Sequence, residues 1–151
     1  MNRFKRYKDD VYQVIGAAMK VHSELKWGLL EAVYNEAMQI ELSERHLSFE
    51  PEALVSCFYK KHLLKKRYKI DMYVENIIVE LKSVQSIVPA HRAQLFNYMR
   101  LTKQPIGLLI NFGNTMLQGE RYGYIEETNE CVLLDKDMNI LREVVDWSSE
   151  E

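Results

Sequence analysis

The chain has little cysteine, the residue that forms disulfide-linked and zinc-ribbon domains. Its two cysteines, Cys57 and Cys131, are isolated and form no CxxC unit, which is typical of reduced core thiols rather than of zinc ligands or a disulfide. No apolar run approaches the roughly 18 residues of a membrane span. Residues 1–6 are polar and lack the apolar region of a signal peptide. We therefore expect a cytoplasmic protein.

A strong net charge is also absent. The formal charge of −2 gives no overall attraction to nucleic acid or membranes, although it leaves room for a local basic patch. The sequence has no internal repeat and no low-complexity linker, and 47% hydrophobic with 28% charged residues is ordinary for a globular protein. A chain of 151 residues is long enough to bury a real core. We expect one domain over residues 1–151.

Hydrophobic periodicity predicts helices first and strands afterwards. Apolar residues recur at helical spacing over about 10–25 and 29–45, and Pro89 opens a third helix of about 12 residues, where proline is tolerated. Strands are predicted near 49–59, 67–74, 77–83, 106–112, 121–126 and 131–134, and residues from 146 onward are expected to fray. Because the third helix lies between strands 77–83 and 106–112, those two strands can run parallel. The fold class is therefore α/β with a mixed sheet.

The segment from 68 to 82 predicts a hairpin with a polar face. Two β-branched-rich runs flank Glu75-Asn76, which can form a two-residue turn. This register pairs Val74 with Ile77 and places Asp71 opposite Glu80. Alternation then gives an apolar face that packs on the core, consisting of Ile70, Met72, Val74, Ile77, Val79 and Leu81. The other face carries Lys69, Asp71, Tyr73, Ile78, Glu80 and Lys82.

Two opposed carboxylates need a physical explanation, because like charges directly opposite each other destabilise a sheet. Asp71 and Glu80 are oxygen donors that suit Mg²⁺ or Mn²⁺. A cluster neutralised by Lys69 and Lys82 is the alternative. Lys82 points to the same side as Glu80, where it can act on an attacking water or stabilise developing negative charge. The alternative for Lys82 is an exposed salt bridge.

Four motifs in order resemble a known family. They are Gly28-Leu29-Leu30-Glu31-Ala32-Val33-Tyr34 (GxxExxY), Asp71, Glu80-Leu81-Lys82 (ExK) and Gln94-Leu95-Phe96-Asn97-Tyr98 (QxxxY). Together they resemble the GxxExxY proteins of the PD-(D/E)XK nuclease superfamily over about residues 10–125, leaving a C-terminal extension of about 126–151. The resemblance implies a restriction-endonuclease-like core, a mixed sheet flanked by helices. It also implies phosphodiester hydrolysis, in DNA, that depends on Mg²⁺ or Mn²⁺.

The resemblance also implies a role for each motif residue. Asp71, Glu80 and the Leu81 carbonyl would hold the metal, with Glu31 approaching it directly or through water. Lys82 would act on the water, and Gln94 and Tyr98 would hold the lysine or the substrate phosphate. From the residues alone, Glu31 also fits a solvated helix position and Tyr98 an amphipathic core residue. We expect structural roles for His22 and His91.

The most basic stretch precedes Asp71. Its cations are Lys60, Lys61, Lys65, Lys66, Arg67 and Lys69. Such a patch can track a phosphate backbone, with Tyr59 and Tyr68 stacking on bases. A charged edge strand that discourages aggregation would look the same.

Two other functional classes stay open. The fold can serve as a catalytically dormant module that binds nucleic acid or protein. It can also serve as a structural homodimer, with an interface formed by Tyr122, Tyr124, Val132, Leu133 and Leu134. A homodimer is compatible with the nuclease hypothesis too, and an unidentified protein partner remains open.

Overall fold

From α1 to β6, the helices and strands follow one another in the order that periodicity predicts. A computed structural model describes residues 2–144. A short 3₁₀ turn, Lys5–Tyr7, leads into α1 (Lys8–Leu25) and α2 (Glu31–Glu44). The remaining elements are β1 (Phe49–Tyr59), β2 (His62–Val74), β3 (Ile77–Lys82), α3 (Pro89–Thr102), β4 (Ile106–Asn111), β5 (Gln118–Ile125), β6 (Glu130–Leu134) and β7 (Ile140–Val144). β7 was not predicted, and the predicted fraying from 146 onward lies outside the described residues.

The strands form one mixed sheet in sequence order, β1 to β7. All neighbouring pairs are antiparallel except β3 and β4, which are parallel in the register Glu80 with Leu109 and Lys82 with Asn111. The crossover helix α3 makes this parallel pair possible, as predicted, because parallel strands cannot be joined by a tight turn. The mixed α/β sheet is confirmed.

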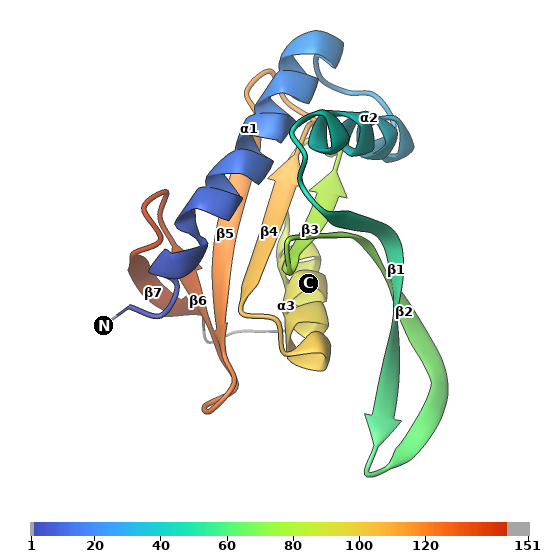
Figure 1. The fold of residues 1–151 in the computed structure, drawn as a ribbon, viewed down its shortest axis with the longest axis vertical. Helices are drawn as coiled ribbons and strands as arrows, with labels where there is room; N and C mark the ends of the chain where they lie inside the picture. The colour runs from blue at the N-terminus through green and yellow to red at the C-terminus, as the bar shows by residue number, and fades with distance from the viewer. Residues whose placement is uncertain (1, 145–151) are drawn as a thin grey trace.

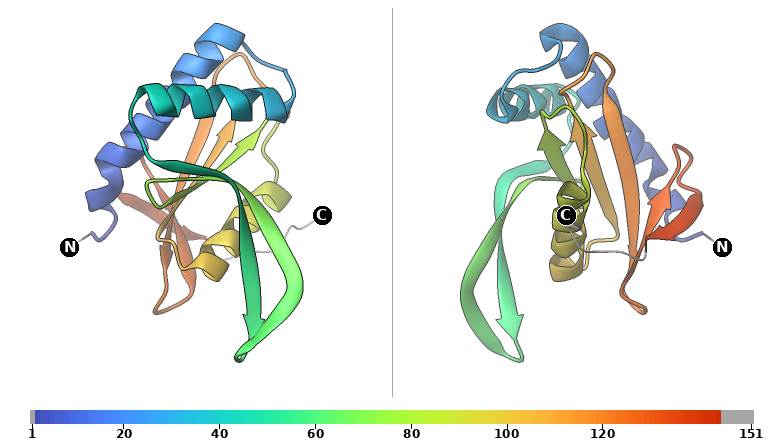
Figure 2. Two further views of the ribbon diagram at one scale, coloured as in Figure 1. Left: turned by 45° about the vertical axis from the view of Figure 1, so that its right-hand side comes forward. Right: turned by 180° about the vertical axis from the view of Figure 1, so that it is seen from behind.

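Helices cover both faces of the sheet (Figure 1, Figure 2). On one face α1 and α2 pack through Val14, Met38 and their neighbours against Met72, Val79 and Ile110. On the other face Leu95, Phe96 and Met99 of α3 pack on the opposite side of the same strands. β3 and β4 are therefore buried on both sides, which explains the nearly continuous apolar runs in their sequences.

The predicted hairpin register is correct at its turn. Val74 pairs with Ile77 and Met72 with Val79, and both turn residues, Glu75 and Asn76, have positive φ, as a type I′ turn requires. Five of the six predicted apolar residues lie in the core that faces α1 and α2.

The prediction is wrong for Ile70, which packs with the α3-side cluster. The register between β2 and β3 ends at Met72 and Val79, while β2 stays paired with β1 through Ile70 and Ala53. Because β2 is paired with β1 but not with β3 at this point, its side chains no longer follow the alternation set by the hairpin. Ile70 therefore faces the opposite side of the sheet from the one that alternation alone predicts.

Beyond that point β1 and β2 leave the body of the protein as a two-stranded arm, residues 54–69 (Figure 1, Figure 2). β2 is longer than the predicted 67–74, because Tyr59 pairs with His62 at the arm's tip and carries the strand back to residue 62. Phe58, Tyr59 and Leu63 are exposed there. The arm therefore presents apolar, aromatic and basic side chains away from the sheet.

The C-terminal aromatic segment is part of the core. Tyr122, Tyr124, Val132 and Leu134 are buried within the chain, and Leu133 packs partly buried against the α3-side cluster. The prediction that these residues form a dimer interface is wrong, because β5 and β6 pair antiparallel and direct them into the two packed layers. Cys57 and Cys131 are both free and buried, as predicted. Among the described residues no helix is long and apolar enough to cross a membrane.

Candidate active site

A buried carboxylate, Glu80, and a half-buried one, Asp71, meet where β2 and β3 separate. Glu80 Oε2 accepts a hydrogen bond from the backbone N–H of Asp71 at 2.8 Å, and Asp71 Oδ2 accepts one from the backbone N–H of Leu81 at 2.8 Å. Each side chain thus binds the backbone of the strand opposite, in place of the ladder hydrogen bonds that end at Met72 and Val79. This arrangement holds Asp71 and Glu80 beside each other, as the hairpin register predicted.

The surroundings of Asp71 and Glu80 disfavour the ionised form of both carboxyl groups. Burial, followed by repulsion from the Asp71 carboxylate, raises the pKa of Glu80 to about 8. Burial also raises the pKa of Asp71, although the hydrogen bond from Leu81 and the nearby Lys82 ammonium act against that rise. Opposite charge nearby favours ionised carboxylates. A bound cation would therefore stabilise the ionised forms of Asp71 and Glu80.

Lys82 joins this cluster from the end of β3. It is half-buried, its charge stabilises the ionised forms of Asp71 and Glu80, and its Nζ donates to Gln94 Oε1 on α3 at 3.3 Å. Because β3 and β4 are parallel and α3 joins them, the helix returns along the same side of the sheet as Lys82. The structure therefore brings Lys82 and Gln94 together.

Tyr98 lies one helical turn beyond Gln94. It is 4% exposed, and burial together with the Glu80 and Asp71 charges raises its pKa to about 12. The described residues give its hydroxyl no hydrogen-bond partner. Its ring packs edge-on to Tyr68 at 5.9 Å between centroids. Tyr98 thus combines core packing with a hydroxyl that is protonated near neutral pH and lies beside the carboxylates.

Glu31 approaches the cluster but does not complete it. It is exposed at the first position of α2, and its Oε2 lies 3.4 Å from the backbone N–H of Ser83. Its charge contributes to the raised pKa of both Asp71 and Glu80. Within residues 2–144 no three His, Cys, Asp or Glu side chains converge on one metal position. The donor set that the structure assembles is thus the pair Asp71 and Glu80, with Glu31 at its edge.

The tyrosine of the GxxExxY segment positions the loop that precedes Glu31. Tyr34 is fully buried and stacks on Phe112 at 4.4 Å. Its hydroxyl donates to the Lys26 carbonyl at 2.7 Å and accepts the Leu29 N–H at 3.1 Å. Gly28, at φ 88°, donates its N–H to the Phe112 carbonyl at 3.3 Å. The motif spacing thus ties the loop before α2 to the end of β4, next to Ser83.

A buried asparagine, which the sequence analysis did not single out, supports the other side of the site. Asn111 is fully buried at the end of β4. Its Oδ1 accepts from the N–H groups of Val84 and Gly113, and its Nδ2 donates to the Val84 carbonyl and Gln118. A complete set of partners is what burial of an amide requires. Asn111 therefore fixes the loop that follows Lys82. The only signal in the sequence was a polar residue ending an apolar strand.

The two histidines have structural contacts, as expected. His91 Nδ1 accepts the Val88 N–H at 3.1 Å at the start of α3. His22 Nε2 lies 2.8 Å from the Asn114 carbonyl. Each ring therefore holds a turn of the backbone in place.

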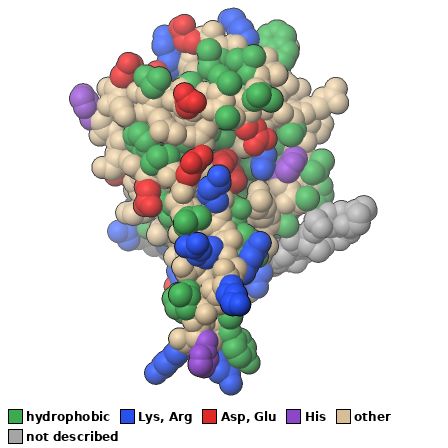
Figure 3. All heavy atoms as spheres, turned by 90° about the vertical axis from the view of Figure 1, so that its right-hand side faces the viewer, with side chains coloured by type: hydrophobic (Ala, Val, Ile, Leu, Met, Phe, Trp, Pro, Cys, Tyr) green, Lys and Arg blue, Asp and Glu red, His purple; other side chains and the backbone are tan. Residues whose placement is uncertain are grey.

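The six predicted nucleic-acid-binding residues lie on the arm, and Lys69 among them is close enough to Asp71 for its charge to favour the ionised carboxylate. All six are exposed, two in the turn between β1 and β2 and four on β2, and Lys69 Nζ is 4.0 Å from Glu52 Oε2. Figure 3 shows Lys and Arg side chains gathered along the projecting arm, with Asp and Glu side chains where the arm meets the body. The arm thus forms a basic surface that leads toward the acidic cluster.

Comparisons with known proteins agree with this architecture. A family model described as the PD-(D/E)XK nuclease superfamily matches residues 8–122. Three chains of solved structure match. The crystal structure of SSO0001 aligns with a TM-score of 0.52 and 17% identity, covering 84% of this chain and 66% of that chain. No match was found among curated proteins. The likeness shows the fold, and the predicted restriction-endonuclease-like core is confirmed.

Proposed function

This chain belongs to the PD-(D/E)XK nuclease superfamily, and from this premise we propose that it is a divalent-metal-dependent nuclease that hydrolyses phosphodiester bonds in DNA. Within the superfamily, we propose that the chain belongs to the GxxExxY group. One observation carries the proposal. Glu80, which is buried, and Asp71, which is half-buried, lie side by side, and each accepts a hydrogen bond from the other strand's backbone. Lys82 lies next to them and is hydrogen-bonded to Gln94.

Ionising a buried carboxylate beside a half-buried one is unfavourable unless a cation joins them. Oxygen donors of this kind fit Mg²⁺ or Mn²⁺. Asp71 and Glu80 would hold the ion, the Leu81 carbonyl would add a ligand, and Glu31 would act from the edge of the site. When bound, the ion would offset the charge that develops on the phosphoryl oxygens.

Lys82, Tyr98 and Gln94 then position the water and the phosphate. Lys82, held by Gln94, orients the attacking water and stabilises negative charge on the phosphate. Tyr98 is protonated near neutral pH, since its ordinary pKa of 10 is raised further to about 12, so its hydroxyl can donate to a phosphate oxygen. Gln94 keeps the ammonium group directed at the site. These roles require no covalent intermediate.

The exposed arm provides the contact with the nucleic acid backbone. Its exposed cations, from Lys60 to Lys69, can neutralise phosphates on either side of the scissile bond. Backbone contacts position a substrate without reading its sequence. A protein partner or a second copy of the chain, if either is required, would add the target selection that this contact does not supply.

The test is cleavage of supercoiled plasmid and of labelled single strands with Mn²⁺, Mg²⁺ or EDTA. Wild type is compared with Glu80→Gln and Lys82→Ala, and with the controls Glu24→Gln and Lys20→Ala, an exposed ion pair on α1. We expect metal-dependent cleavage that both site variants lose by at least about 100-fold and both controls retain. Equal cleavage by all five proteins would point to a contaminant. Strands that bind unchanged with and without metal and stay intact would favour the dormant binding module.

A further inference from the structure

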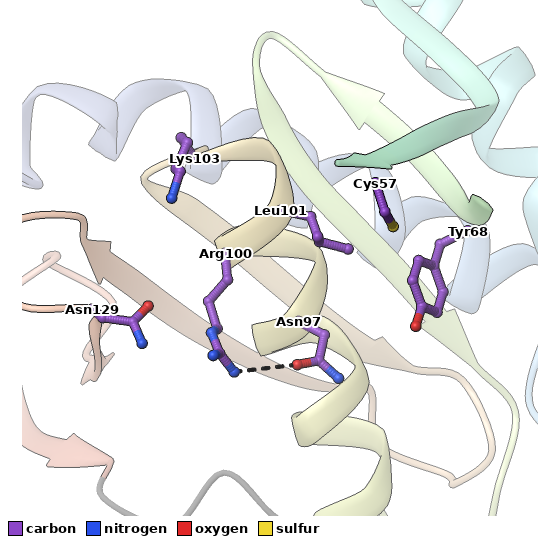
Figure 4. A pocket seen from close by; sticks show the side chains of 7 residues that line it. All are labelled: Cys57, Tyr68, Asn97, Arg100, Leu101, Lys103 and Asn129. Atoms are coloured by element: carbon purple, nitrogen blue, oxygen red, sulfur yellow. Dashed lines mark hydrogen bonds between the residues drawn. The ribbon is translucent and has the colours of Figure 1, made fainter. Parts of the chain in front are cut away.

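A cavity beside the carboxylate site has no role in the chemistry proposed above. It has a volume of about 420 Å³, within the range of small-ligand pockets. Tyr68 of β2 lies at one side, Asn97, Arg100 and Lys103 come from α3 and its end, and Asn129 comes from the turn between β5 and β6 (Figure 4). Three separate parts of the fold therefore converge on one hollow.

This cavity adjoins the active site through a pair of rings. Tyr68 packs against Tyr98 at 5.9 Å, and Tyr98 is in turn close enough to Glu80 and Asp71 to respond to their charges. Along α3, Gln94, Asn97 and Tyr98 lie at i, i+3 and i+4, so they share one side of the helix. Gln94, which holds Lys82, and Leu101, which lines the cavity, are about 10 Å apart along the helix axis. The cavity thus lies one to a few nucleotides from the proposed site of cleavage.

The polar groups around the cavity are mainly donors. No described Asp or Glu lines it, and Arg100 and Lys103 are cationic. Asn97 Oδ1 accepts from Arg100 at 3.5 Å and Asn129 Oδ1 accepts from the Tyr124 hydroxyl at 2.8 Å. Each amide therefore has its N–H₂ group left to donate to a ligand.

Tyr68 supplies an aromatic surface in this donor-rich setting. The Lys66 ammonium group lies over its ring, 5.0 Å from the centroid. Lys66 is exposed on the arm, so its ammonium group is able to move away from the Tyr68 ring and contact a neighbouring phosphate. A flat ligand can then stack on the ring. An aromatic face, cations and amide donors together match the base and phosphate of a nucleotide.

We propose that this cavity binds one nucleotide of a single strand, adjacent to the scissile phosphate, with its base against Tyr68; the proposal rests on the function proposed above. A base enters only when it is not stacked in a duplex. Donor groups that face this edge of the base prefer thymine O4 or guanine O6 to the amino group that cytosine or adenine carries at the same position. The substrate class is therefore a single strand, or an unpaired region of a duplex, with a keto base at that position.

The experiment measures affinities of labelled 12-nucleotide strands in EDTA, where no cleavage occurs. The probes are oligo(dT), oligo(dC) and an abasic strand of equal length. Wild type is compared with Tyr68→Leu, with Tyr68→Phe, which keeps the ring, and with Tyr12→Leu, an exposed tyrosine on α1. We expect Tyr68→Leu to weaken oligo(dT) binding by about 5- to 150-fold and to leave the abasic strand unchanged. Tyr68→Phe and Tyr12→Leu retain wild-type affinity.

Asn97→Ala gives a second, independent measurement at an exposed helix position, and it decides the question if Tyr68→Leu does not fold. We expect this variant to lose a preference for oligo(dT) over oligo(dC) of about 2- to 10-fold. If Tyr68→Leu weakens abasic and base-bearing strands equally, or if Asn97→Ala leaves the preference intact, the pocket proposal is overturned. The proposed nuclease then still stands on metal-dependent cleavage. Absence of both strand binding and cleavage would instead overturn the proposed function.

Discussion

Replacing Glu80 with glutamine tests the carboxylate pair without any assay of cleavage. The glutamine keeps the size of the side chain and an oxygen that can accept the Asp71 N–H. It removes a charge that burial and the Asp71 carboxylate oppose. In the metal-free protein this charge lowers the free energy of unfolding whenever Glu80 is ionised.

The sign and size follow from the pKa of Glu80, which is about 8 in the folded protein and 4.5 in its ordinary state. Because the folded pKa is the higher one, the stability linked to the Glu80 proton is fully present below about pH 4.5. It is lost as the pH rises through about 8. Each pKa unit corresponds to 1.36 kcal/mol. Between pH 6 and pH 9 we therefore expect wild type to lose about 2–3 kcal/mol that Glu80→Gln does not lose.

Urea denaturation in EDTA at pH 6, 7, 8 and 9 measures this difference, with Glu24→Gln as the exposed control. A second series with Mg²⁺ or Mn²⁺ should restore the stability of wild type at pH 9, because a bound cation favours the ionised carboxylates. It should leave Glu80→Gln nearly unchanged. Parallel pH profiles for wild type and Glu80→Gln in EDTA would refute the reasoning about the buried charge. Equal stabilisation of both proteins by metal would refute the assignment of the metal to this pair.

Three further predictions test other parts of the structure. Tyr34→Phe removes a buried hydroxyl that has two backbone partners, at Lys26 and Leu29, so it should lower the free energy of unfolding by about 1–3 kcal/mol; urea denaturation measures this, and no change would contradict the tether of that loop. The triple variant Lys65→Ala, Lys66→Ala, Arg67→Ala should reduce the slope of log affinity for duplex DNA against log salt by up to about 3; anisotropy titrations at several salt concentrations measure this, and an unchanged slope would mean that the arm does not touch phosphates. Gly113→Ala would place a Cβ about 2.0 Å from the backbone oxygen of Val84, where no side-chain movement relieves the clash, so thermal unfolding should report a loss of about 3 kcal/mol; wild-type stability would show that this backbone can move apart.

Local features of the fold could be predicted from the sequence because their causes are local. The period of two along a strand and the two-residue turn at Glu75-Asn76 fix which residues face each other near that turn. The same spacing places Asp71, Glu80 and Lys82 together, and helical periodicity places Gln94 and Tyr98 on one side of α3. The mixed sheet follows from a helix lying between two strands.

Other features depend on which strands pair, which no local period specifies. Ile70 changes sides because β2 leaves β3 at Asp71 and continues on β1 alone. The aromatic residues of β5 and β6 look like an exposed interface in the sequence, yet two packed layers bury them. The hydrogen bonds from the Tyr34 hydroxyl to the Lys26 carbonyl and from the Asn111 amide to the Val84 carbonyl join residues that are not neighbours in the chain.

The residue types of the candidate site and their order can be predicted from a few residues at a time, since strand and turn geometry act over that range. Their electrostatic environment arises only when the chain is packed. Glu80 is an ordinary carboxyl in the sequence, and its pKa rises to about 8 only because the sheet and α3 exclude water from it and place Asp71 alongside. The cavity at Tyr68 is likewise invisible in the sequence, because its walls come from the arm, α3 and the β5–β6 turn. Burial and long-range contact are properties of the packed chain, and packing is what no short segment encodes.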